Sequence, residues 1–300
     1  MTSVAAPTPS RVIESRDRLL SRLANPAALV CGIVNATPDS FSDGDQYRDP
    51  ERAVEHGRKL VAEGAELLDI GGESTRPGSH PPSVGEEIAR IVPVIEALAS
   101  TTSTPISVDT SRAEVMREAV AAGAVMINDV RALRSPGALS TAASLRVPVC
   151  LMHMQGEPAD MQAAPAYTDV VDEVGEFLLD RVSACRMAGI PLDHIVIDPG
   201  FGFGKTLPHN LELLGSLRRI ANLGLPVMAG LSRKGMLGTI TGRDVTARQP
   251  ASVAAAMIAA QHGASILRVH DVAATVDALA VARAIREATT ERAPHGAQLM

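Results

Sequence analysis

An aspartate followed by alternating glycines and phenylalanines, in the segment DPGFGFGK from Asp198 to Lys205, has the residue types of a ligand site. It overlaps the apolar run HIVIDPG, which is predicted as a strand from its β-branched residues and its length. A carboxylate at the end of a buried strand, followed by glycines that let a ligand approach the backbone, is typical of a binding site. We expect Phe201 and Phe203 to form a wall for a flat ligand. The alternative is a tight turn whose two rings fold back onto the sheet.

Polar side chains stand at or just past the end of every predicted strand. They are Asn35, Asp69, Asp109, Asn128, His153, Asp198, Ser232 and His270. Barrel enzymes assemble their active sites at the C-terminal ends of their strands, so this ring predicts one site built from many strands. Each residue taken alone has another interpretation, as a turn or helix-capping residue.

Eight strand-then-helix units position these residues. The predicted strands are ALVCGIVN, ELLDIGG, PISVDT, VMINDV, VPVCLMHM, HIVIDPG, LPVMAGLS and SILRVHDV. Successive βα units favour parallel strands, and eight of them close most economically into a single (β/α)8 TIM barrel of the α/β class, with an open doubly wound sheet as the alternative. Loops 1, 2 and 7 are expected to be long, and loop 7 comprises SRKGMLGTITGRDV. One helix is expected from Asn210 to Asn222.

The expected domain organisation is one barrel at residues 29–288. Residues 1–28 are expected to be a lead-in that is partly disordered or helical, and residues 289–300 a disordered tail. A chain of 300 residues with 46% hydrophobic content is long enough to bury a core of this size.

Charge and composition limit the function classes. The net charge is −6, and the chain has two tyrosines and no tryptophan, so it lacks the basic face and stacking surfaces of a nucleic-acid-binding protein. The three cysteines are Cys31, Cys150 and Cys185, and the first two lie in apolar strand-like runs, which indicates buried thiols in a reducing compartment. Without a signal-like N-terminus or a run long enough to span a membrane, we expect a cytoplasmic protein with no membrane contacts.

Eight motifs occur in order along nearly the whole predicted barrel: NATPDSFSDG, GGESTRPG, SVDT, INDV, LMHMQG, DPGFGFGK, SRK and RVHD. Together they resemble the dihydropteroate synthase family of pterin-binding barrels, over about residues 29–285. The resemblance implies a folate-biosynthesis transferase that condenses p-aminobenzoate with (7,8-dihydropterin-6-yl)methyl diphosphate. The products are 7,8-dihydropteroate and pyrophosphate, and Mg²⁺ assists the reaction.

A reduced pterin has several N–H donors and one carbonyl along its edge, so its pocket should offer carboxylates, an amide oxygen and a cation. The resemblance implies that Asp109, Asn128, Asp198 and Lys234 hold this edge. It also implies that Arg268 stacks on the ring and that Ile127 and Met152 line the cleft. The alternative for Asp198 is an ion pair with Lys234 that serves stability alone.

The diphosphate requires cations or hydrogen-bond donors as negative charge develops on the leaving oxygen. The candidates are Asn35, Thr75, Arg76, Arg268 and His270. The resemblance implies that Asn35 is the Mg²⁺ ligand, and a neutral amide suffices because Mg²⁺ keeps its waters and takes phosphate oxygens. The implied catalytic set is Asp109, Asp198, Lys234, Arg268 and His270. For His270 alone, a structural role behind the site is the alternative.

The slot for p-aminobenzoate is implied to consist of Phe41, Thr75, Pro77, Phe203, Lys234 and Gly235. Gly235 departs from the resemblance, because the family more often has a hydroxyl or a bulkier side chain at this position. The reaction needs no enzyme nucleophile. In an SN1-like displacement the methylene loses pyrophosphate, the resulting cation is delocalised into the pterin, and the unprotonated arylamine attacks it.

Two other functions are compatible with a pterin pocket: a pterin-binding methyltransferase domain and a non-catalytic homologue. The SRK, GGESTRPG and DSFSDG motifs argue against the first, and a first loop with Asn35 and Phe41 intact argues against the second. The late helices ASVAAAMIAAQHG and VAATVDALAVARAIREA are apolar on more than one face. We therefore expect them to meet a second copy, and the resemblance implies a homodimer that forms through these helices; the alternative is that they are deeply buried outer helices of one chain.

Overall fold

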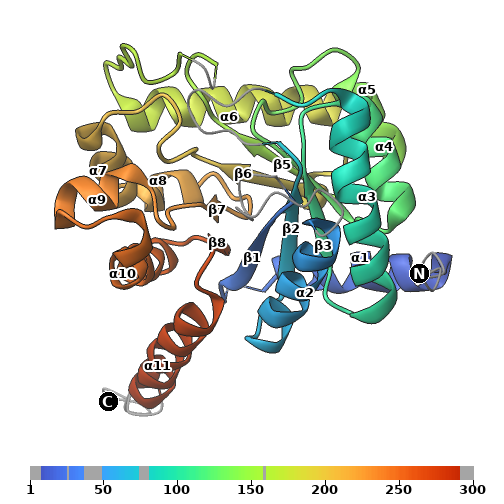
Figure 1. Ribbon diagram of the computed structural model, residues 1–300. Helices are drawn as coiled ribbons and strands as arrows, with labels where there is room; N and C mark the ends of the chain where they lie inside the picture. The colour runs from blue at the N-terminus through green and yellow to red at the C-terminus, as the bar shows by residue number, and fades with distance from the viewer. Residues whose placement is uncertain (1–7, 26, 37–48, 74–80, 158–159, 291–300) are drawn as a thin grey trace, which may run out of the picture.

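The computed structural model describes residues 8–25, 27–36, 49–73, 81–157 and 160–290, and its strands form one parallel sheet inside a layer of helices (Figure 1). The strands are β1 (Leu29–Asn35), β2 (Leu67–Gly71), β3 (Ile106–Asp109), β4 (Met126–Asp129), β5 (Val149–Met152), β6 (Ile195–Asp198), β7 (Met228–Ala229) and β8 (Ile266–Val269). They pair in the order β6-β5-β4-β3-β2-β1-β8-β7. A parallel bridge between Ile197 and Val227 brings β6 beside β7. The predicted (β/α)8 barrel is confirmed, and it is nearly closed.

Most of the surrounding helices begin and end where the sequence signals place them. They are α2 (Asp49–Ala62), α3 (Val84–Thr101), α4 (Ala113–Ala122), α5 (Ala138–Leu145), α6 (Val170–Met187), α10 (Gln249–Gln261) and α11 (Val272–Thr290). Ser83 and Glu86 form a capping box at the start of α3, and the side chain of Asp169 accepts two backbone N–H bonds at the start of α6. Gly123 ends α4 in the left-handed conformation.

Two of the expected elements are wrong. The single helix expected from Asn210 to Asn222 is divided at Ser216 into α7 (Leu207–Gly215) and α8 (Leu217–Ala221). The segment expected to be a long loop after β7 contains helix α9 (Gly235–Thr241), which ends at Gly242 in the left-handed conformation. Its sequence, GMLGTIT, carries two glycines, and tertiary packing of the buried Met236 and Leu237 outweighs their low helix propensity.

The strands alternate their side chains between two cores. Outward residues such as Val30, Val108 and Ile197 pack against the helices in the main core. Inward residues at the N-terminal end of the strands, such as Leu67 and Met228, fill the bottom of the barrel. The polar residues therefore occupy the other end of the barrel interior, where the strands finish.

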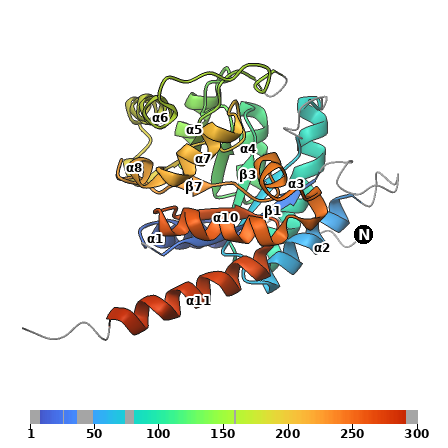
Figure 2. The same cartoon turned by 90° about the vertical axis from the view of Figure 1, so that its left-hand side faces the viewer.

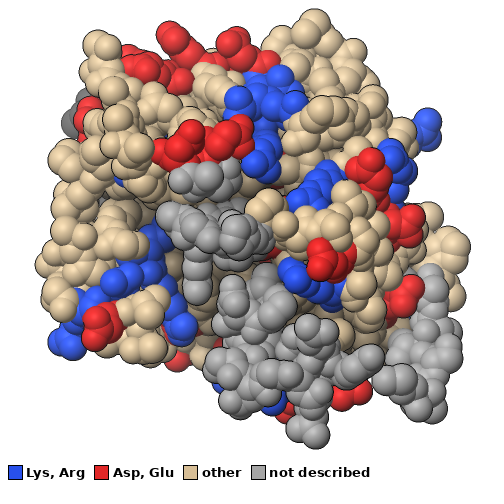
Figure 3. Space-filling model, turned by 45° about the horizontal axis from the view of Figure 1, so that its top comes forward, with Lys and Arg blue, Asp and Glu red and all other residues tan. Residues whose placement is uncertain are grey.

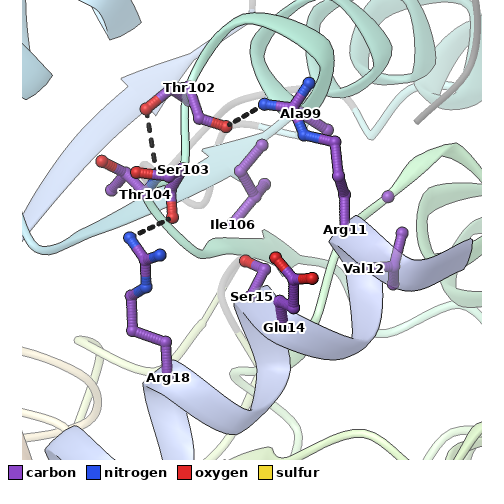
Figure 4. A pocket seen from close by; sticks show the side chains of 11 residues that line it. Arg11, Val12, Glu14, Ser15, Arg18, Ala99, Thr102, Ser103, Thr104 and Ile106 are labelled. Carbon is purple, nitrogen blue, oxygen red and sulfur yellow. Dashed lines mark hydrogen bonds between the residues drawn. The ribbon is translucent and has the colours of Figure 1, made fainter. Parts of the chain in front are cut away.

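Helix α1 (Pro9–Leu23) closes the bottom of the barrel, although the sequence analysis placed residues 1–28 outside the barrel domain. Leu19 and Leu23 are buried and belong to the inner apolar cluster. Arg11 donates to the carbonyl of residue 100 at 2.6 Å, and Arg18 donates to the carbonyl of residue 103 at 3.2 Å. These bonds attach α1 to the end of α3 beside a small pocket (Figure 4).

Several features bear on compartment and partners. Cys31 and Cys150 are buried free thiols as expected, and so is Cys185. Among the residues that the structure describes, no helix is long and apolar enough to cross a membrane. Figure 3 shows acidic and basic side chains interspersed on one face of the molecule. In Figure 2, α11 extends away from the barrel.

Candidate active site

Arg268 on β8 connects two carboxylates inside the C-terminal mouth of the barrel. Its Nε donates to Oδ2 of Asp69 at 2.6 Å, and its terminal nitrogen donates to Oδ2 of Asp109 at 2.8 Å. The Nδ2 group of Asn128 donates to the same Asp69 oxygen at 3.0 Å. Because a carboxylate only accepts hydrogen bonds, Asp69 orients the amide of Asn128 and leaves its carbonyl oxygen for a ligand donor.

The surroundings of Asp109 raise the pKa of its carboxyl group. Burial raises its pKa to about 7, against the lowering effect of the Arg268 cation and together with the raising effect of Asp69. Its side chain keeps 19% of its surface exposed, so it remains accessible to a ligand. A buried carboxylate with a raised pKa beside a specific cation is a feature of functional sites.

Asp198 and Lys234 form a second charged group across the mouth. Oδ1 of Asp198 accepts the N–H of Gly200 at 2.7 Å, and burial raises the pKa of this carboxyl, with the Lys234 cation opposing the shift. Burial lowers the pKa of Lys234 to about 8, against the attraction of Asp198. The hydrogen bond of Lys234 goes to the carbonyl of Phe201, and its Nζ lies 4.6 Å from the centre of the Phe203 ring.

The apolar wall of the mouth differs by one residue from the expectation. Met152 clusters with Val130, Met154 and Met161. Ile127 is fully buried in the main core between strands and helices, so the structure does not support it as a lining residue. Side chains of β4 alternate, and Asn128 faces inward while Ile127 faces the helices.

The two phenylalanines of the glycine loop also differ from the expectation. Phe203 is partly buried and packs against the methionine cluster, where it can line a slot. Phe201 is fully buried in the main core, so the idea of a ligand wall is wrong for this ring. The alternative of a ring folded back onto the barrel holds for Phe201 alone.

The expected diphosphate residues are only partly within the described chain. Asn35 ends β1 opposite Gly71 and is partly exposed. His270 follows β8. Its ring Nδ1 lies 3.0 Å from the hydroxyl oxygen of Ser232, and its backbone N–H donates to the same oxygen at 3.1 Å. Arg268 lies beside them on β8. Four expected residues lie outside the described residues: Phe41, Thr75, Arg76 and Pro77.

Gly235 begins α9 directly after Lys234 and is exposed. A Cβ atom at this position would have no other atom within 4 Å, and its φ is not in the left-handed region. A side chain can therefore be added at Gly235 without strain or displacement of a neighbour.

The described residues contain no group of three or more His, Cys, Asp or Glu side chains that is placed to hold a metal ion. The amide of Asn35 fits a magnesium ion that keeps most of its waters and binds phosphate oxygens. A single neutral amide is a weak ligand by itself, so Asn35 suits a metal that also binds diphosphate oxygens.

The sequence places Asp69 in the ring of polar residues but gives it no ligand contact, and it does not single out Val130 or Lys205. Asp69 lies two residues before the end of β2, whereas Asp109 and Asp198 end their strands, and a charged residue inside an apolar strand was a usable signal. Val130 lies two residues beyond Asn128, at the inward spacing of a strand. Lys205 is 3% exposed although it is a lysine, and no sequence pattern indicated that burial.

Asp109 and Asp198, whose pKa values are raised, face the cations Arg268 and Lys234 at the C-terminal ends of barrel strands, which is typical of a barrel enzyme that binds a small polar ligand. The family model of pterin binding enzymes matches residues 31–270. Dihydropteroate synthase of Haemophilus influenzae is 50% identical over 259 residues, which cover 86% of this chain and 94% of the relative.

Two solved structures extend the comparison. Xanthomonas albilineans dihydropteroate synthase with 4-aminobenzoic acid is 58% identical, with a TM-score of 0.83 over 87% of this chain and 93% of the other. The enzyme from that organism in complex with 7,8-dihydropteroate is 56% identical, with a TM-score of 0.80 over 87% and 94%. The chain belongs to the dihydropteroate synthase family of pterin-binding enzymes and is a transferase of an alkyl group other than methyl.

Proposed function

We propose that the chain condenses p-aminobenzoate with (7,8-dihydropterin-6-yl)methyl diphosphate by an SN1-like displacement, forming 7,8-dihydropteroate and pyrophosphate. The observation that carries the proposal is that Asn128 and Arg268 both donate hydrogen bonds to the same oxygen of Asp69. It leaves an amide oxygen for ligand donors beside the carboxyl of Asp109. This arrangement suits the donor-rich edge of a reduced pterin.

Asp198 and Lys234 complete the set of residues that contact the pterin edge in this proposal. Asp198 is an acceptor for pterin N–H groups, and Lys234 is a donor for the pterin carbonyl. Arg268 covers the ring, and Met152 packs against it from the apolar wall. The hydrogen bonds of Asp198 and Lys234 to the pterin would be strengthened by burial, because a charged hydrogen bond is stronger where water is excluded.

The leaving diphosphate is assigned to Arg268, His270 and Asn35, together with Thr75 and Arg76. Positive charge and donors near the departing oxygen stabilise the charge that develops there. Magnesium, held by Asn35 and phosphate oxygens, would supply further charge neutralisation when bound. Calorimetry offers a test apart from turnover: we expect Mg²⁺ to bind with pyrophosphate present and not without it.

The second substrate is assigned to a slot formed by Phe41, Thr75, Pro77, Phe203, Lys234 and Gly235. An arylamine is already unprotonated at neutral pH, so the site needs to hold it in line with the methylene more than to remove a proton. The face of Phe203 suits an aromatic ring, and the nearby Lys234 cation suits a carboxylate.

The deciding experiment is turnover of the two purified substrates with Mg²⁺, followed by pyrophosphate release. A methyltransferase domain would release no pyrophosphate and would transfer a methyl group to a corrinoid protein. A non-catalytic homologue would bind pterin without forming product. Absence of pyrophosphate from folded protein would contradict the proposal.

We also infer a cytoplasmic homodimer that forms through the late helices α10 and α11. Three buried free thiols support a reducing compartment. Ile258 on α10, together with Val281 and Ile285 on α11, is exposed in the single chain. Such apolar side chains favour a protein interface.

A further inference from the structure

The glycine loop after β6 has an unusual set of backbone contacts. Every carbonyl from Gly200 to Thr206 accepts a hydrogen bond from a side chain. The donors are Lys205 for residues 200 and 203, Lys234 for residue 201, Gln162 for residue 202, Tyr167 for residue 204, and Asn210 for residues 205 and 206. Side chains, not a regular secondary structure, therefore fix the path of this loop.

Lys205 makes the central contribution to this set. Its Nζ donates to the carbonyl of Gly200 at 3.0 Å and to the carbonyl of Phe203 at 3.1 Å, and it lies 2.9 Å from Nδ1 of His153. An ammonium group has three N–H donors, and three acceptors surround this one. A buried lysine whose donors are all satisfied holds its partners more firmly than a solvated one.

His153 is suited to be the third acceptor. Burial, and to a smaller extent the Lys205 cation, lower its pKa to about 3, so the imidazole is neutral and can offer the lone pair of Nδ1. The ring packs edge-on against Phe177 at a centroid distance of 4.9 Å. Its backbone N–H donates to the carbonyl of Asp198 at 2.9 Å. Lys205 thus links the end of β5 to the loop that follows β6.

The loop lies directly against the segment after β5. A Cβ atom on Gly200 would be 1.9 Å from the carbonyl oxygen of His153, and one on Gly204 would be 2.3 Å from the carbonyl oxygen of Gln155. Both glycines also have positive φ. No side chain fits at either position, so the loop approaches closely enough for Lys205 to span it.

The two halves of the loop are held differently. Phe201 is fully buried in the main core and its carbonyl also accepts from Lys234, so its half of the loop keeps two anchors that do not involve Lys205. Phe203 is partly exposed, and its half depends on hydrogen bonds to the carbonyls of residues 202–204. Loss of Lys205 should therefore disturb Phe203 and leave Phe201 in place.

We propose that Lys205 is a positioning residue that fixes Phe203 for the aromatic amine substrate and has little influence on the pterin edge. The proposal rests on the proposed function, because it assigns Phe203 to the slot for p-aminobenzoate. Lys205 acts through the Phe203 backbone and does not contact either substrate.

The test is the variant Lys205→Met, which keeps the length of the side chain and removes all three donors. We expect the KM for p-aminobenzoate to rise on the order of tenfold. The KM for the pterin diphosphate should change by less than about threefold, because core packing still holds Phe201. Burial lowers the pKa of Lys205 to about 7, against the effect of Asp198. The assay should therefore be run at pH 6, where the Lys205 side chain is an ammonium.

Two further variants complete the comparison. Lysine occurs only at positions 59, 205 and 234, and Lys59 is exposed on α2, so Lys59→Met is the matched control and should leave both KM values unchanged. Tyr167→Phe removes the donor to the carbonyl of Gly204, which is 2.7 Å away. It should raise the KM for p-aminobenzoate in the same direction by about threefold, and it serves as the test if Lys205→Met does not fold.

Hydrogen exchange of the amides of residues 202–204 gives a measurement that needs no turnover. We expect faster exchange in Lys205→Met than in the wild type, with the amides of β6 unchanged. If the wild type releases no pyrophosphate, the proposed function fails, and the exchange rates still decide whether Lys205 holds the loop. Equal rises in both KM values, or an unchanged exchange rate, would overturn the proposal.

Discussion

Asp69 is a buried carboxylate that organises two neighbouring side chains. It is fully buried, and its Oδ2 atom accepts hydrogen bonds from both Arg268 and Asn128. Its Oδ1 atom has no hydrogen-bond partner in the described structure. Because two donors converge on one buried carboxylate oxygen, Asp69 fixes the orientation of both Asn128 and Arg268.

Replacement Asp69→Asn should weaken pterin binding. An amide at this position can present N–H groups to Arg268 and Asn128, so the cation loses a charged partner and the Asn128 amide loses its fixed orientation. We expect the dissociation constant for the pterin diphosphate to rise by roughly tenfold to a hundredfold, or about 1.5–3 kcal/mol. Titration calorimetry measures it, with the exposed Asp172→Asn as control. A change below about twofold would show that Asp69 does not orient the pocket.

The charged groups across the mouth give a second prediction. Asp198→Asn and Lys234→Ala should each lower kcat/KM by an amount equivalent to about 2–4 kcal/mol, because each removes a charged partner from a desolvated pterin edge. Far-ultraviolet circular dichroism should stay native. A loss equivalent to less than about 1 kcal/mol in either variant would mean that the pterin lies elsewhere.

Gly235 allows a gain-of-function test. A hydroxyl there could donate to the carboxylate of p-aminobenzoate, a bond worth roughly 1.5–3 kcal/mol at best and less where water already occupies the place. Because space is open around its Cβ position, Gly235→Ser should lower the KM for p-aminobenzoate by up to about tenfold and leave the pterin KM unchanged. Gly235→Ala is the control without a hydroxyl. An equal effect of both variants would exclude the hydrogen bond.

Strands and most helices could be predicted from the sequence because their signals are local. Apolar runs identify the strands, and the aspartates and asparagines that follow them identify the end of the barrel where the site lies. Three features needed tertiary information instead: the helix in the loop after β7, the burial of Phe201, and the neutral His153 that accepts a bond from Lys205. Each feature depends on contacts with residues that are distant in sequence, and the periodicity of apolar residues does not predict such contacts.

Helix α1 lies in the predicted lead-in, and it contributes two leucines to the barrel bottom. Leu19→Ala should lower the free energy of unfolding by about 2–4 kcal/mol, through lost burial and the cavity that remains. Ile13→Ala on the same helix is the control, because Ile13 is 50% exposed, and it should cost less than about 1 kcal/mol. Urea unfolding measures both. Equal costs would indicate that α1 does not close the barrel.

At the scale of the whole molecule, the last helix is only partly supported by the barrel. Val272 and Thr275 at its start are buried, whereas nearly all residues from 281 to 289 are exposed. Figures 1 and 2 show α11 projecting beyond the strands. Val281 and Ile285 are 62% and 60% exposed and lie four residues apart, on one face of the helix. A long helix with an unpacked apolar face is stabilised when another surface covers it.

A second copy of the chain is the partner that we infer for this face. Light scattering at micromolar concentration should give twice the chain mass of 31.3 kDa. The double variant Val281→Glu, Ile285→Glu should give the mass of one chain, because two charges in an apolar interface lack partners. Met187→Glu on α6 is the control, since Met187 is 82% exposed on another helix, and it should remain dimeric. A wild-type protein of single-chain mass would refute the dimer, and an unchanged mass for the double variant would place the interface on another surface.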